Sequence, residues 1–277
     1  DFVYLSPSCL KEALTFLSEY KEKYKIIAGG QSLLILMRQG LVSPEYLIDI
    51  KHLKELNYID FKSKEGLKIG ATTTHRTIEK SSLIKQHFPV LARMEENLAS
   101  IETRNWGTIG GNLCNAAPSA DTASPLISLR ATVKLVSSKR ERTIALEKFF
   151  TGPDETVLKH DELLIEIQVP NLPSRTGGTY LKLFSRGAVD IATVGVAVML
   201  TLGENEICDR ARIVLAAVAP TPIRAKGAEE VIEGRRIEDG IVEKAAEIAF
   251  EEAQPISDVR SSAEYRREMV RVLTKQA

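Results

Sequence analysis

Two glycine-rich stretches, Ala28-Gly29-Gly30-Gln31-Ser32-Leu33 and Thr108-Ile109-Gly110-Gly111-Asn112-Leu113, lie about eighty residues apart in this chain. We call them the first and second glycine segments. Adjacent glycines let a backbone approach a ligand closely, and free N–H groups at the start of a helix attract phosphate. Two such segments can hold both ends of an extended diphosphate, so a dinucleotide-type cofactor is the first hypothesis.

Each segment also has a purely structural interpretation. The first segment alone is equally compatible with a tight strand-to-helix turn, and it is not a Rossmann fingerprint, because Gly29 and Gly30 are adjacent and no third glycine follows. The second segment is compatible with a long structured surface loop. Its crowd of polar residues favours a ligand, and Asp121 is placed to accept from a sugar or ribityl hydroxyl.

Composition bounds the class of protein. The chain has 277 residues, 44% of them hydrophobic, so it can bury a core and form more than one domain. Lys plus Arg equals Asp plus Glu at 37 each, so no global field attracts nucleic acid. Three scattered cysteines, Cys9, Cys114 and Cys208, cannot form a disulfide framework, a zinc site or an iron–sulfur cluster within the chain. We expect a reducing, cytoplasmic setting, no metal ligands and no direct membrane insertion.

Hydrophobic patterning predicts an order of elements. A strand at 26–28, a helix at 32–38 and a strand at 46–50 form a β-α-β-like unit. Later strands are predicted at 132–136, 162–169, 178–184, 194–202 and 211–218, with helices between and after them. The last helix is predicted to turn Tyr265, Met269, Val272 and Leu273 inward. Its opposite basic face, solvated or available to a partner, comprises Arg266, Arg267, Arg271 and Lys275.

Further motifs appear in a definite order: Gly70-Ala71-x-Thr73, then Pro118 and Asp121, Lys182, Arg186 with Asp190-Ile191-Ala192, and the run from Arg260 to Arg267. With the two glycine segments, this pattern resembles the medium, FAD-binding subunit of molybdenum hydroxylases, the group that includes xanthine dehydrogenase and carbon monoxide dehydrogenase. The resemblance spans essentially the whole chain. Three cysteines do not suffice for the cluster insertion of the related hydroxybenzoyl-CoA reductases.

The resemblance implies an α+β fold in three parts. Residues 1–53 and 54–173 would form a two-part FAD-binding domain of the vanillyl-alcohol-oxidase (PCMH) type. Residues 174–277 would form an α+β C-terminal domain with a small antiparallel sheet and helices. FAD would be held noncovalently, since His75 has no local activator for covalent attachment.

The resemblance also assigns cofactor contacts, but no catalytic residue. Ile26, Ile27 and the first segment from Ala28 to Leu33 would wrap the FAD pyrophosphate. The second segment, through Thr108, Gly110, Gly111 and Asn112, would bind phosphate and sugar-side groups together with Asp121. The positions near the flavin ring are Leu98, Leu164, Lys182 and Ile191. Lys182 would face the isoalloxazine carbonyl end, and Ile191 would shield the ring where an electron acceptor approaches, although a strand-core role for Ile191 is equally compatible.

The implied function is electron transfer within a complex. FAD would accept electrons from the iron–sulfur clusters of a small partner subunit, after a large subunit with a molybdenum cofactor has oxidised the substrate, and would pass them to an external acceptor. One alternative is a self-contained FAD-dependent oxidase or reductase acting directly on an organic substrate. Another is a nucleotide-binding or assembly protein without redox work.

Overall fold

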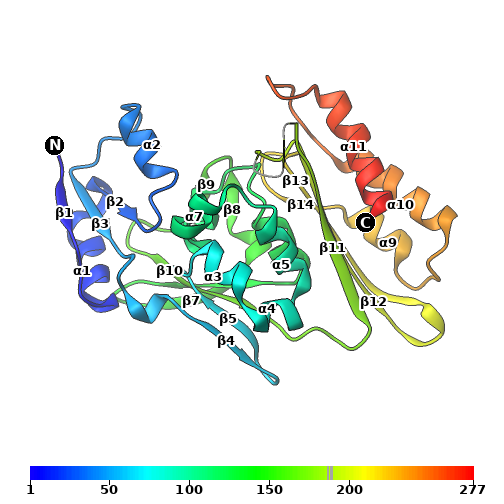
Figure 1. Cartoon of the computed structure of the whole chain (residues 1–277), viewed down its shortest axis with the longest axis horizontal. Helices are drawn as coiled ribbons and strands as arrows, with labels where there is room; N and C mark the ends of the chain where they lie inside the picture. Colours follow the sequence, from blue (N-terminus) through cyan, green and yellow to red (C-terminus); the bar gives the residue numbers. More distant parts are fainter. Residues whose placement is uncertain (186, 188–189) are drawn as a thin grey trace.

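The computed structural model describes residues 1–185, 187 and 190–277. Three sheets of three or more strands follow one another along the longest axis of the molecule (Figure 1). A parallel sheet lies at the N-terminal end, an antiparallel sheet with helices packed on it lies in the middle, and a second antiparallel sheet separates that middle part from the last three helices. The expected α+β class is confirmed.

The N-terminal unit is a parallel sheet in the order β1-β3-β2. Its elements are β1 (Val3–Leu5), α1 (Leu10–Tyr20), β2 (Tyr24–Ile27), α2 (Leu33–Arg38) and β3 (Tyr46–Asp49). The predicted β-α-β unit is present, whereas β1 was not expected. Leu14 and Leu17 of α1 pack on Ile48 of β3, which gives the unit its own small core.

The middle part is built on an antiparallel sheet in the order β4-β5-β10-β6-β7. The strands are β4 (Ile59–Lys62), β5 (Gly66–Gly70), β6 (Thr132–Val136), β7 (Glu141–Ala145) and β10 (Leu163–Val169), with a small hairpin of β8 (Phe150–Gly152) and β9 (Glu155–Thr156). Between β5 and β6 come α3 (His75–Lys80), α4 (Ser82–His87), α5 (Pro89–Glu96), α6 (Ile101–Trp106), α7 (Ile109–Asn115) and α8 (Ala123–Ser128). These helices and the sheet enclose the largest hydrophobic cluster.

The C-terminal sheet has two covered faces. Its strands are β11 (Thr176–Leu183), β12 (Val194–Leu202), β13 (Cys208–Ala216) and β14 (Ile223–Arg224), all antiparallel. Tyr180, Ala197 and Met199 join the core of the middle part. The alternate residues, such as Val196 and Val198, face α9 (Lys226–Ile232), α10 (Asp239–Glu252) and α11 (Ala263–Gln276). Because successive side chains of a strand point to opposite faces, this one sheet contributes residues to two hydrophobic cores.

The prediction for α11 was wrong at Arg266, which was assigned to the basic outer face. Arg266 is only 4% exposed, and its guanidinium donates to the Thr193 and Ala217 carbonyls at 3.1 and 3.0 Å and pairs with Asp258 at 2.7 Å. Tyr265 and Val272, predicted to point inward, are exposed. A buried guanidinium is tolerated here because two carbonyls and a carboxylate accept from its terminal nitrogens, although its Nε has no partner among the described residues.

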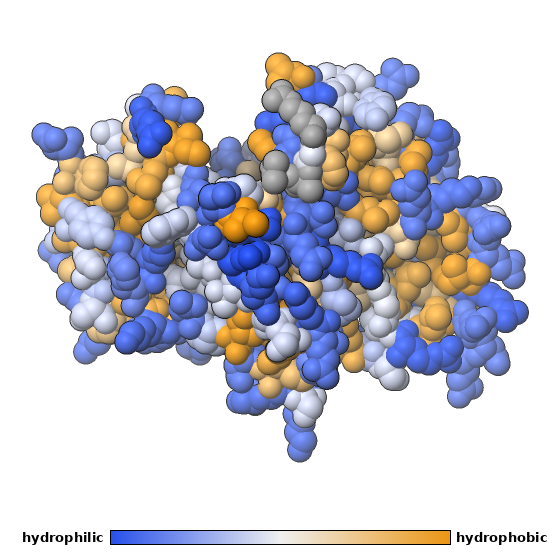
Figure 2. All heavy atoms as spheres, viewed as in Figure 1, coloured by the Kyte–Doolittle hydropathy of each residue, from blue (hydrophilic) through white to orange (hydrophobic). Residues whose placement is uncertain are grey.

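The outer surface is mixed in character. Figure 2 shows hydrophilic residues concentrated over the middle helices, with apolar residues scattered over the N-terminal unit and the C-terminal part. Within the described residues, no helix is both long enough and apolar enough to cross a bilayer. No group of three or more potential metal ligands is found in that same part of the chain.

Candidate cofactor-binding site

The first glycine segment links β2 to α2, as the sequence predicted. Gly30 has a φ of +71°, a left-handed conformation that favours glycine. Gly29 is required for a different reason: a Cβ there would lie 2.3 Å from the Trp106 carbonyl oxygen and 2.7 Å from the Gly107 Cα. The first segment therefore lies directly against the residues that lead into the second.

A row of unused amides distinguishes the first segment. In the described structure, the N–H groups of Gly30, Gln31, Ser32 and Leu33 donate to no protein acceptor. Ser32 precedes α2 without capping it through its side chain, and its hydroxyl is exposed. Neighbouring amides of this kind, next to the start of a helix, form a suitable cradle for a phosphate group.

The second glycine segment was expected as a turn, but it is the first turn of helix α7. Thr108 caps this helix, its Oγ1 accepting from the Gly111 amide at 3.2 Å. The amides of Ile109, Gly110 and Asn112 donate to the carbonyls of Thr73, Ala71 and Thr108 at 3.0, 2.9 and 2.9 Å. The amides from Ile109 to Asn112 are therefore already used within the protein, which leaves mainly side chains for a ligand.

The two glycines of the second segment differ in their surroundings. A Cβ on Gly110 would lie 2.6 Å from the Ala71 Cβ and 2.7 Å from the Ala71 carbonyl oxygen. A Cβ on Gly111 would meet only the Thr108 Oγ1, at 2.8 Å, and Gly111 is exposed. Near them, the Asn112 Oδ1 is buried with no hydrogen-bond partner among the described residues. Such an orphaned acceptor fits a donor supplied by a cofactor.

Asp121 and Lys182 were predicted to contact different parts of the cofactor, but they form a buried ion pair. The Lys182 Nζ lies 2.8 Å from one Asp121 oxygen and donates to the Asn97 carbonyl at 3.1 Å. The Tyr180 hydroxyl donates to the other Asp121 oxygen at 2.6 Å. Burial raises the pKa of Tyr180 well above 10, so the phenol stays protonated and donates.

The turn that contains Leu98 is held by two cations. Arg104 donates to the carbonyls of Leu98 and Ala99, both at 2.7 Å, while Lys182 holds the carbonyl of Asn97. Leu98 and Leu164 are buried in the same hydrophobic cluster, so contact with a flavin would be through their backbone or through packing beneath it. Leu164 also adjoins a register shift in the pairing of β10 with β6.

Ile191 lies in an exposed part of the predicted site. Ile191 is 46% exposed, and its amide donates to the Asp190 carboxylate at 3.0 Å. The predicted partnership of Asp190 with Arg186 lies outside the described residues. The exposed apolar side chain is available to shield a ring.

Two further side-chain contacts, whose partners were not predicted, lie next to residues 106 and 107. His75 is buried, and its Nδ1 lies 3.0 Å from the Glu95 carboxylate, which supports the backbone next to Gly107. The Lys51 Nζ lies 3.4 Å from the ring centroid of the exposed Trp106. The signal available in the sequence was that the only tryptophan directly precedes Gly107.

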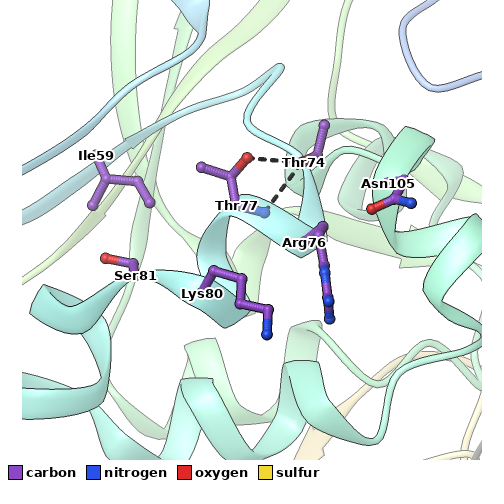
Figure 3. A pocket seen from close by; sticks show the side chains of 7 residues that line it. All are labelled: Ile59, Thr74, Arg76, Thr77, Lys80, Ser81 and Asn105. Carbon is purple, nitrogen blue, oxygen red and sulfur yellow. Dashed lines mark hydrogen bonds between the residues drawn. The ribbon is translucent and has the colours of Figure 1, made fainter.

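A cavity of about 610 Å³ lies beside α3 (Figure 3). Ile59 of β4 and Asn105 of α6 line it together with Arg76 and Lys80. The Arg76 guanidinium already pairs with Glu79 at 2.6 Å. None of the predicted cofactor residues lines this cavity, so it is separate from the candidate site.

Comparisons with known proteins cover the whole chain. Residues 1–172 match the family model for the FAD-binding domain in molybdopterin dehydrogenase, and residues 179–277 match the carbon monoxide dehydrogenase flavoprotein C-terminal domain. The glyceraldehyde dehydrogenase medium chain of Sulfolobus acidocaldarius is 36% identical, over 100% of this chain and 97% of that protein. The xanthine dehydrogenase FAD-binding subunit of Escherichia coli O157:H7 is 31% identical, over 100% and 94%. The carbon monoxide dehydrogenase structure from Hydrogenophaga pseudoflava superposes with a TM-score of 0.95 at 33% identity, over 100% of this chain and 95% of that one.

Proposed function

The chain belongs to the FAD-binding medium subunits of the molybdenum hydroxylases, and from this membership we propose that it relays electrons from iron–sulfur clusters of a small partner, through FAD, to an external acceptor. The electrons would come from a large partner that holds a molybdenum cofactor. The relatives are named as medium chains or FAD-binding subunits of dehydrogenases, which supports a place within a larger complex.

FAD supplies the redox chemistry, because it takes up electrons singly and releases them singly or as a pair. The observation that carries the assignment of the site is the row of four unused amides from Gly30 to Leu33. We propose that they hold the pyrophosphate, with the Ser32 hydroxyl as an added donor. Ile26, Ile27, Ala28, Gly29 and Gln31 would shape that cradle.

Side chains of the second segment would complete the diphosphate and sugar-side contacts. Thr108 and Asn112 would contribute polar groups, and the Asn112 Oδ1, which has no partner in the protein, would gain a donor. Gly110 and Gly111 carry no side chain and would leave room for the cofactor. Asp121 still has free lone pairs beyond those used by Tyr180 and Lys182.

The residues proposed to lie near the flavin ring would orient it and supply one positive charge. The Lys182 ammonium has three N–H donors and uses two of them, so one is available to an isoalloxazine carbonyl. Leu98 and Leu164 would support the ring, and Ile191 would shield its open face. None of these roles requires the chain to supply an acid or a base.

The test uses the assembled complex under anaerobic conditions. Substrate should reduce both the clusters and the flavin, seen as bleaching of their visible bands. Complex from which FAD has been stripped should still reduce its clusters but should no longer pass electrons to an acceptor dye, and added FAD should restore that transfer. Oxidation of an organic substrate by the isolated FAD-loaded chain would instead support the self-contained oxidase or reductase.

A further inference from the structure

A second cleft, also of about 610 Å³, lies between the middle part and the C-terminal sheet. One side is formed by the end of α8 and the residues after it, together with the linker at 170–173. The other side is formed by β12, β13 and β14. No residue predicted to contact FAD lines it.

Arginine dominates the charge of this cleft. The lining arginines are Arg130, Arg210, Arg212 and Arg224, and the lining carboxylates are Asp209 and Glu233. Arg212 and Arg224 share one oxygen of Glu147, at 3.4 Å from each, and Arg224 also pairs with Glu229. Across the described residues, Arg130 and Arg210 form no ion pair with a carboxylate.

Strand register brings three of these arginines to one face. Arg210 and Arg212 are two residues apart on β13, and Arg224 of β14 pairs with Val214, the next residue on that face. Arg130 reaches the same cleft from the end of α8. Desolvation and the neighbouring Arg224 and Arg130 lower the pKa of Arg212. Gathering like charges in this way costs free energy that a bound anion would offset.

Arg130 is one of nine described non-glycine residues with a positive φ. Its φ is +62°, in the left-handed region that glycine favours at the residue after a helix. A large cation therefore occupies a position whose backbone conformation favours glycine. A residue held in such a conformation is grounds for a functional hypothesis.

We propose that the cleft binds a small phosphorylated organic molecule, with its phosphate groups on Arg130, Arg210 and Arg212. The planar guanidinium fork matches phosphate oxygens with two parallel hydrogen bonds, which makes arginine the preferred residue for this recognition. Apolar lining from Leu129, Leu172 and Met199 provides a surface for the organic part. The proposal is independent of the electron relay and of the FAD site.

The test titrates the FAD-loaded chain with a hexose bisphosphate and with pyrophosphate, by calorimetry. Arg130→Gly suits its backbone, and Arg210→Ser removes an exposed side chain without an ion pair, so both variants should fold. Each should weaken hexose bisphosphate binding about tenfold, the value of one lost charged hydrogen-bonding contact. The matched control is Arg236→Ser, an exposed arginine of the same domain that pairs with Glu206 and does not line the cleft, and the affinity of this variant should not change.

Three results would overturn the proposal. One is the absence of saturable binding by the hexose bisphosphate. Another is equal weakening in Arg236→Ser, which would mean that the surface charge attracts anions without a site. The third is pyrophosphate binding at least as tightly as the sugar, which would reduce the site to one for inorganic oxyanions. Retention of FAD in all variants confirms that the flavin site is unaffected by the test.

Discussion

The two glycine segments look alike in sequence but use their glycines differently. In the first, four successive amides from Gly30 to Leu33 are unused by the protein. In the second, the amides from Ile109 to Asn112 are all bound within the chain, to Thr73, Ala71 and Thr108. A Gly-Gly pair can therefore leave the neighbouring amides open to a ligand or have them bound within the protein, although each segment has one glycine, Gly29 or Gly110, packed too tightly for a side chain.

The difference follows from what each segment packs against. The first leaves the edge of a parallel sheet and enters a short helix that is largely exposed. The second starts a helix whose first turn is bound to the end of β5 through Ala71 and Thr73. Backbone donors for a ligand are thus concentrated in the first segment, while the second offers side chains.

The contact between the segments gives the largest expected effect. In Gly29→Val the side chain would overlap the backbone of Trp106 and Gly107, so both segments must move. We expect loss of bound FAD and a loss of about 3 kcal/mol in the free energy of unfolding, because the overlapped atoms belong to the backbone and cannot rotate away as a side chain could. Flavin absorbance after gel filtration and urea unfolding would measure the two effects.

Gly177→Ala is the control for that variant, because a Cβ there meets nothing within 4 Å. It should keep both its flavin and its stability. If Gly29→Val also kept both, the close approach of the two segments would be disproved.

The second prediction separates the two glycines of the second segment. Gly110→Ala places a methyl group against Ala71, so the FAD-free chain should lose about 2 kcal/mol of unfolding free energy. In Gly111→Leu the new side chain overlaps only the Thr108 hydroxyl, so it should cost no more than the roughly 1 kcal/mol of that helix cap while blocking FAD retention. Equal behaviour of the two variants, in urea unfolding and in flavin content, would contradict the distinction.

Sequence patterning predicted some elements closely and missed others for identifiable reasons. Strands at 132–136 and 194–202 were predicted with the observed bounds, because apolar residues mark them clearly. β4 was missed because its alternation covers only four residues in a polar stretch, and β7 because it is a charged edge strand. Both depend on neighbouring strands for their definition rather than on their own composition.

The residues of the candidate site could be singled out from the sequence, but the bonds among them could not. Asp121 and Lys182 were both singled out, yet their direct pairing joins residues 61 positions apart and left no local signal. Arg104 was not singled out, because its role depends on the carbonyls of Leu98 and Ala99 folding back toward it. Hydrogen bonds to backbone carbonyls cannot be predicted from side-chain spacing alone.

The third prediction concerns the cap of the second segment. Thr108→Ala removes the acceptor for the Gly111 amide and should cost about 1 kcal/mol of unfolding free energy. Thr108→Ser should restore that stability, because its hydroxyl can accept the same bond. Failure of serine to recover the midpoint of urea unfolding would show that the threonine methyl group, not the cap, matters.

The smallest effect is expected at the corresponding position of the first segment. Ser32 precedes α2, but its side chain makes no capping bond, so Ser32→Ala should change the unfolding free energy of the FAD-free chain by less than about 0.5 kcal/mol. If its hydroxyl donates to the cofactor phosphate, the dissociation constant for FAD should rise severalfold, the effect of losing about 1 kcal/mol of hydrogen bonding. Fluorescence titration of the stripped chain with FAD would measure it. A loss of stability as large as that of Thr108→Ala would mean that both segments use their hydroxyls to cap helices. The two segments would then differ in their backbone amides but not in the role of their hydroxyl side chains.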